Sequence, residues 1–171
     1  MSGLHEVHLL EWSMPQPGFP AGQLLPQMHL QRNLIAIIDD SPTVRKVIET
    51  CLRREQYAVI AFNTGIDAVR WYQEQLQAPI PALIFLDITM PKMDGYQVAQ
   101  TLKRDLRFAA SVLIMLSRHA GLLERIKARL AGCQAYLTKP CPTEKLVQTV
   151  HTYLEDPAMA ERREADGSCE W

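Results

Sequence analysis

Short apolar segments alternate with amphipathic segments along most of the chain. Five apolar runs are too short for buried helices and rich in branched residues, as strands are: residues 34–38, 57–62, 82–86, 111–116 and 135–137. Most of them are apolar throughout, which is typical of strands buried on both faces of a parallel sheet that helices cover. The pattern therefore predicts an α/β fold with a doubly wound, five-stranded parallel sheet.

Segments with helical periodicity follow these runs. In the first, Ser41 is placed to cap a helix and Pro42 suits its first turn, and one face is apolar: Val44, Val47, Ile48, Cys51 and Leu52. Further helices are expected near residues 66–76, 96–106, 121–130 and 143–154, with Gly132 ending the fourth. Five alternations of strand and helix predict repeated βα units.

Composition changes at both ends of the chain. Residues 1–32 contain four prolines and three glycines, which predicts a flexible extension. They also contain more apolar residues than a solvated linker needs, so docking on the same chain or on a partner is a second interpretation. Residues 157–171 are charged and lack an apolar period, which predicts a disordered tail. The folded domain is expected to span residues 33–156.

The overall composition excludes several classes of protein. A net charge of −1 gives no electrostatic case for binding nucleic acid or an anionic membrane surface. No apolar run approaches the ~20 residues of a membrane helix, and the first residues do not resemble a signal peptide. The four cysteines form no Cys-x-x-Cys pair, which indicates reduced thiols. We expect a cytoplasmic protein without membrane insertion.

Polar side chains that carry chemistry follow four of the predicted strands, at the point where each strand ends. These residues are Asp39, Asp40, Asp87, Ser117 and Lys139. In open α/β sheets the ligand site lies outside the carboxyl ends of the strands. The first and third strands are neighbours in the flavodoxin-like order 2-1-3-4-5. We therefore expect three carboxylates, a hydroxyl and an ammonium to share one pocket.

The predicted pocket suits a metal ion and a phosphoryl group. Clustered carboxylates repel one another unless a cation joins them, and Mg²⁺ prefers such oxygen ligands. Asp87 ends the central strand, and a carboxylate there can form an acyl phosphate. Lys139 supplies a charge and Ser117 a hydroxyl donor for phosphoryl oxygens. The peptide bond between Lys139 and Pro140 can be cis, because it precedes a proline. Taken alone, each of these residues is more typical of a helix cap, a turn or a solvated surface than of a functional site. The prediction of a site therefore depends on the whole set.

Four motifs resemble the receiver domain of bacterial response regulators. They are Ile-Asp-Asp-Ser ending at Ser41, Leu86 to Gly95, Leu116-Ser117, and Tyr136 to Pro140. The resemblance covers about residues 33–156. It implies a five-stranded parallel sheet flanked by five helices, and transfer of phosphate from a histidine kinase onto Asp87.

The resemblance also implies a role for each matching residue. Asp39, Asp40 and Asp87 would bind Mg²⁺ together with the backbone carbonyl of Thr89. Ser117 and Lys139 would contact the phosphoryl group, and Ser117 and Tyr136 would form a conformational switch. Such receivers catalyse their own phosphorylation and dephosphorylation and are not conventional enzymes.

The short segment after the last predicted helix leads us to expect output through a partner protein. The chain looks most like stand-alone receivers of chemotaxis and of twitching motility driven by type IV pili. The expected partners are a sensor histidine kinase, of chemotaxis type in this reading, and a downstream protein target. No direct nucleic-acid partner is expected, and the protein should be a monomer or a weak dimer.

Some interpretations stay open at this stage. Arg118 and His119 stand where small residues are usual in the family, and Arg118 either covers the pocket or lies in solvent. We expect His119 to be a loop residue and not a second phosphoacceptor. A phosphatase of the haloacid dehalogenase type is an alternative, but it needs an aspartate where Thr89 stands. A receiver-like adaptor that works without phosphorylation is the other alternative.

Overall fold

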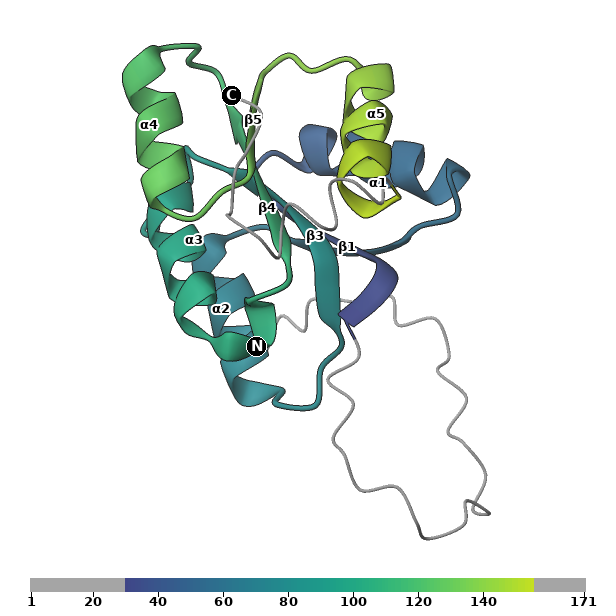
Figure 1. The fold of residues 1–171 in the computed structure, drawn as a ribbon, viewed down its shortest axis with the longest axis vertical. Coiled ribbons are helices and arrows are strands. Elements are labelled where there is room, and N and C mark those ends of the chain that lie inside the picture. The colour runs from purple at the N-terminus through teal and green to yellow at the C-terminus, as the bar shows by residue number, and fades with distance from the viewer. Residues whose placement is uncertain (1–29, 156–171) are drawn as a thin grey trace, which may run out of the picture.

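Five parallel strands form the centre of the molecule (Figure 1). The computed structural model describes residues 30–155. The strand order is β2-β1-β3-β4-β5, which confirms the predicted order 2-1-3-4-5. The strands are β1 (Leu30–Ile38), β2 (Ala58–Phe62), β3 (Ile80–Asp87), β4 (Val112–Ser117) and β5 (Ala135–Thr138). Strands β3 and β4 are buried along their whole length, as expected for strands covered on both faces.

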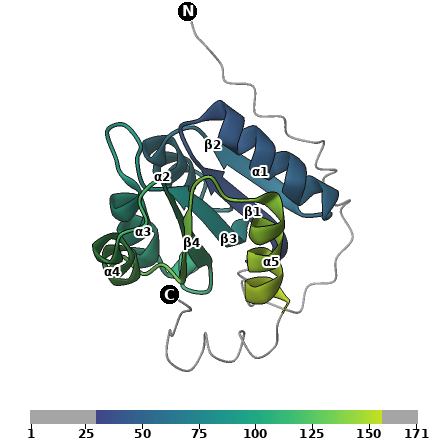
Figure 2. The ribbon, with the colours of Figure 1, turned by 90° about the horizontal axis from the view of Figure 1, so that it is seen from above.

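Helices cover both faces of the sheet (Figure 2). They are α1 (Pro42–Arg54), α2 (Gly65–Glu74), α3 (Gly95–Arg104), α4 (Leu122–Leu130) and α5 (Thr143–Leu154), with a short 3-10 helix η1 (Leu106–Phe108). Helices α2, α3 and α4 pack against one core cluster, and α1 and α5 pack against the other. The predicted doubly wound α/β fold is therefore confirmed.

The helix ends follow local sequence signals. The Ser41 side chain accepts a hydrogen bond from the Val44 N–H, so it caps α1 as predicted. Asp94 and Gln97 form a reciprocal capping box at the start of α3. Gly132 follows α4 with φ of 91°, a conformation that favours glycine.

Several boundaries differ from the prediction. Strand β1 begins at Leu30, which pairs with Ile80, so the end of the predicted flexible extension is part of the sheet. Helices α2 and α3 end before Leu76 and Leu106, whose side chains are exposed. Val47, expected on the buried face of α1, is 48% exposed. The rest of the extension and the predicted tail, residues 157–171, lie outside the described residues.

Among the described residues, Cys51, Cys133 and Cys141 form no disulfide, and Cys169 lies outside the described residues. Between residues 30 and 155, no helix is both long enough and apolar enough to cross a membrane.

Candidate functional site

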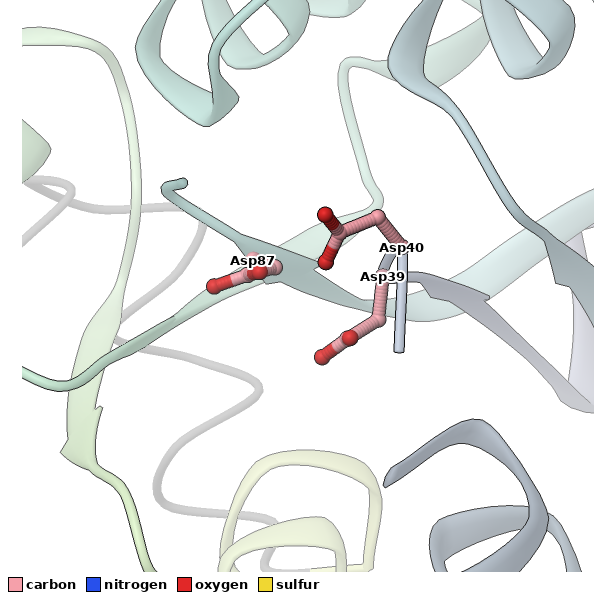
Figure 3. A group of neighbouring side chains, drawn as sticks. All are labelled: Asp39, Asp40 and Asp87. Atoms are coloured by element: carbon pink, nitrogen blue, oxygen red, sulfur yellow. The ribbon is translucent and has the colours of Figure 1, made fainter. Parts of the chain in front are cut away.

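Three carboxylates meet where β1 and β3 end (Figure 3). Asp39 and Asp40 follow β1, and Asp87 is the last residue of the neighbouring strand β3. One carboxylate oxygen from each of the three lies within 4.8 Å of the others. Asp39 and Asp87 are buried, whereas Asp40 is exposed. The predicted convergence of the acidic residues is therefore present, with one side open to solvent.

Lys139 neutralises part of this negative charge. It follows β5, and its Nζ lies 2.6 Å from Asp39 Oδ2 and 2.9 Å from Asp87 Oδ1. The lysine side chain is only 12% exposed, so these ion pairs are shielded from water. The Lys139 N–H donates to the Ser117 carbonyl at 2.6 Å, and the Lys139–Pro140 bond is cis. One ammonium thus joins the ends of three strands.

Backbone and side-chain contacts hold the carboxylates in place. Asp39 Oδ1 accepts from the Ser41 N–H at 2.9 Å, and the Arg45 guanidinium donates to the Asp39 carbonyl at 2.6 Å. Asp87 accepts a hydrogen bond from the Thr89 backbone N–H. The sequence motifs implied only a carbonyl ligand at Thr89, because backbone donors leave no signal in residue identity.

Ser117 connects the pocket to α4. Ser117 ends β4 and is buried, and its Oγ accepts from the His119 N–H at 3.0 Å. Tyr136 Oη donates to the His119 carbonyl at 2.7 Å. The Arg125 guanidinium of α4 lies 5.2 Å from the centre of the Tyr136 ring, a cation–π distance. These contacts form a continuous path from Ser117 to the surface helix.

The two bulky residues after Ser117 both face solvent. Arg118 and His119 are exposed, which favours the solvent alternative for Arg118 over a lid on the pocket. The His119 side chain is therefore a loop side chain, as expected, while its backbone serves the contacts to Ser117 and Tyr136.

Burial raises the pKa of Asp87 above its usual value, and the Asp39 charge adds to this rise while Lys139 opposes it. A raised folded-state pKa contributes stability that is present below the unfolded-state pKa and is lost as pH rises through the folded-state pKa. At neutral pH the ionised Asp87 should therefore destabilise the fold.

Asp87→Asn should consequently be more stable than the wild type at pH 7, and about equal to it near pH 3. Each pKa unit corresponds to about 1.4 kcal/mol. Urea unfolding at both pH values, with a chelator to remove divalent ions, measures the difference. A wild type that is more stable than the variant at pH 7 would contradict the assigned shift.

Gly95 brings α3 against the end of β3. Its N–H donates to the Ile88 carbonyl at 3.0 Å, and a Cβ at this position would lie 2.3 Å from the Asp87 carbonyl oxygen. The sequence analysis identified Asp94-Gly95 only as part of a turn. The close approach to the backbone beneath the candidate nucleophile shows why glycine is needed here.

Gly95→Ala should therefore lower the free energy of unfolding by about 3 kcal/mol, because backbone atoms cannot yield to the new methyl group. Gly121→Ala is the matched control, since a Cβ there meets only the flexible Glu124 carboxylate, at 2.5 Å. Denaturant unfolding of both variants measures the difference. Equal stability of the two would show that the loop after β3 relaxes freely.

The donor set fits a hard divalent cation. Three carboxylates from two neighbouring strand ends supply the oxygen ligands that Mg²⁺ prefers, and the exposed side near Asp40 leaves room for water ligands. Asp39, Asp40 and Asp87 would hold the ion.

This fold and site define a class of signalling domain. The chain belongs to the response regulator receiver domain family, whose profile matches residues 35–151. It is 36% identical over 120 residues to Protein PilG of Pseudomonas aeruginosa, and this match covers 70% of the chain and 86% of PilG. Some other curated relatives are longer: response regulator Rre1 of Synechocystis is 32% identical over 120 residues, and the chain spans 51% of its length.

Solved structures show the same fold. Chemotaxis response regulator CheY4 of Vibrio cholerae superimposes with a TM-score of 0.65 at 22% identity, covering 71% of this chain and 98% of that one. The CheX–CheY–BeF3–Mg complex of Borrelia burgdorferi gives a TM-score of 0.62 at 25% identity, covering 70% and 87%. The resemblance stated from the sequence motifs is therefore confirmed, and the haloacid dehalogenase alternative loses its support.

Proposed function

We propose that the chain accepts a phosphoryl group on Asp87 in a Mg²⁺-dependent reaction, with a sensor histidine kinase as the donor. The observation that carries this proposal is the arrangement at Asp87. Its buried carboxylate lies 2.9 Å from the Lys139 ammonium and within 4.8 Å of two further carboxylates. A nucleophilic carboxylate with a cation and a metal-binding pair of carboxylates around it supplies the parts that phosphoryl transfer requires.

In the proposed reaction, an Asp87 carboxylate oxygen forms a bond to phosphorus. The bond from phosphorus to the donor nitrogen breaks, and the donor imidazole keeps the electron pair and takes up a proton. Lys139 neutralises charge on a phosphoryl oxygen, and Ser117 donates its hydroxyl to another. Bound Mg²⁺ would supply further positive charge at the phosphoryl oxygens. Hydrolysis of the acyl phosphate by water would restore the free carboxylate.

The proposed output is a conformational switch read by a partner protein. If the Ser117 hydroxyl turns toward a phosphoryl group, its acceptor role for the His119 N–H is lost. The Tyr136 hydroxyl, bonded to the His119 carbonyl, would then be free to move with its ring and with Arg125. The phosphorylation event would thereby alter α4 through named contacts.

We place the protein in chemotaxis-like or pilus-motility control in the cytoplasm, acting as a monomer or weak dimer without direct binding of nucleic acid. Similarity to PilG supports this pathway. The similarity of the CheX–CheY–BeF3–Mg complex supports a protein target and Mg²⁺ as the metal.

The test is incubation of the full chain with acetyl phosphate or phosphoramidate, with Mg²⁺ or with a chelator, followed by intact-mass and acid-labile phosphate analysis. We expect one phosphoryl group per chain with Mg²⁺ and none with chelator. Failure with small donors and with a panel of histidine kinases would favour the phosphorylation-independent adaptor.

A further inference from the structure

Helix α4 carries an unusual apolar surface. Leu122, Leu123, Ile126 and Leu130 are 72%, 69%, 46% and 80% exposed. They make up four of the seven exposed large apolar side chains in the described part of the chain, and their spacing places them along one side of the helix. We call these four residues the α4 patch. Exposed apolar side chains that gather on one side of a helix indicate a binding surface, whereas singly scattered ones do not.

The charges around the α4 patch are mainly positive. Helix α4 contains Arg125, Lys127 and Arg129 but only one acidic residue, Glu124. An occupant of this surface should therefore combine apolar side chains with negative charge.

The chain itself contains such a segment. Residues 4–12, which we call the acidic-apolar stretch, read Leu-His-Glu-Val-His-Leu-Leu-Glu-Trp. Glu6 and Glu11 are the only charged side chains before Arg32 when histidine is neutral. The stretch thus offers apolar side chains that could pack on the α4 patch, and negative charges that complement the basic residues of α4.

The connecting length is sufficient. Residues 13–29 separate the stretch from the start of β1 at Leu30. An extended chain spans about 3.3 Å per residue, so these residues reach up to roughly 55 Å. A domain of this size is only about 35 Å across. The stretch can therefore reach α4 although β1 starts at the opposite edge of the sheet from the functional site.

A second surface matches this stretch less well. A groove of about 820 Å³ between α1 and α5 has Val47, Cys51 and Val147 in its lining. Its charges are mixed, with Lys46 and Arg54 beside Glu55 and Glu144. These mixed charges would not attract an acidic segment to the groove. Val47 is the only large apolar side chain in its lining that is strongly exposed.

We propose that residues 4–12 dock in cis on the α4 patch. The contact would be linked to the functional site, because Tyr96 Oη donates to the Glu124 carbonyl and Arg125 stacks on Tyr136. Given the proposed phosphorylation, any partner that reads α4 would compete with the chain's own segment. Docking and phosphorylation would then influence each other by the same coupling free energy.

The test uses ¹⁹F NMR of the full, unphosphorylated chain labelled with 5-fluorotryptophan. The chain has three tryptophans, so Trp12 gives one of three signals, assigned with Trp12→Phe. We expect the Trp12 signal to differ from that of a peptide of residues 1–29. The double variant Leu123→Ser/Leu130→Ser should return the signal to the peptide position, and so should Glu6→Lys/Glu11→Lys.

Leu106→Ser is the matched control, because Leu106 is 82% exposed but belongs to η1 and not to α4. It should leave the Trp12 signal unchanged, and the Trp71 signal reports that each variant is folded. A wild-type Trp12 signal at the peptide position would overturn the proposal. A signal that moves from the peptide position only as protein concentration rises would also overturn it, and would assign the patch to a second copy. Because no phosphodonor is present, failure here is separate from failure of the proposed phosphorylation.

Discussion

Asp87→Asn is expected to abolish phosphorylation under every condition that phosphorylates the wild type. An amide oxygen is too weak a nucleophile to attack phosphorus, and the amide carries no charge to help bind the metal. The side chain is buried at the end of β3, so asparagine should occupy the same space. Intact-mass analysis after acetyl phosphate and Mg²⁺ should find the unmodified mass alone.

Asp67→Asn is the matched control for this experiment. Asp67 is an exposed carboxylate in the first turn of α2, and it is not one of the three carboxylates that cluster at the site. This variant should gain one phosphoryl group, as the wild type does. If Asp87→Asn still gained a phosphoryl group, peptide mapping would show whether Asp39 or His119 accepts it, and the assignment of Asp87 would be wrong.

The strand-end residues could be predicted because their positions follow from topology alone. A run of apolar residues that ends in aspartate, in a sheet whose strands are all parallel, brings each aspartate to the same edge. Asp39, Asp87 and Lys139 came together for this reason, although 100 positions separate Asp39 from Lys139. The types of these residues and their positions at strand ends were sufficient to predict that they lie together, and no side-chain detail was needed.

Other features depend on details that periodicity does not contain. Leu76 and Leu106 continue the apolar pattern of α2 and α3, yet both helices end earlier. Asp105 stops α3 by accepting the Arg107 N–H in the next turn. The stacking of Arg125 on Tyr136 and the close approach of Gly95 to Asp87 are contacts between elements far apart in the sequence. Only the packed structure shows them.

Lys139 has a second role that the sequence did not indicate. It was expected to serve the phosphoryl group, but it also pairs with Asp39 and Asp87 directly. Without the ammonium, two buried carboxylates would face each other unpaired, and the pKa of Asp87 would lose the contact that lowers it. The lysine thus opposes the rise in the pKa of the nucleophile that burial causes.

Lys139→Ala should remove both the charge for a phosphoryl oxygen and the ion pairs with Asp39 and Asp87. It should therefore slow phosphorylation by acetyl phosphate by about 10²–10³-fold, the usual cost of removing one preorganised donor to a developing negative charge. Lys145→Ala is the matched control, because Lys145 is an exposed lysine of α5 that takes part in none of the contacts described at the site. The phosphorylation rate of Lys145→Ala should stay within about threefold of the wild-type rate, since exposed charges contribute little.

The initial rate of acyl phosphate formation is measured for both variants, and circular dichroism confirms that each is folded. A folded Lys139→Ala variant as fast as Lys145→Ala would show that Mg²⁺ alone supplies the positive charge, and the ion pairs of Lys139 would then serve only to position Asp39 and Asp87.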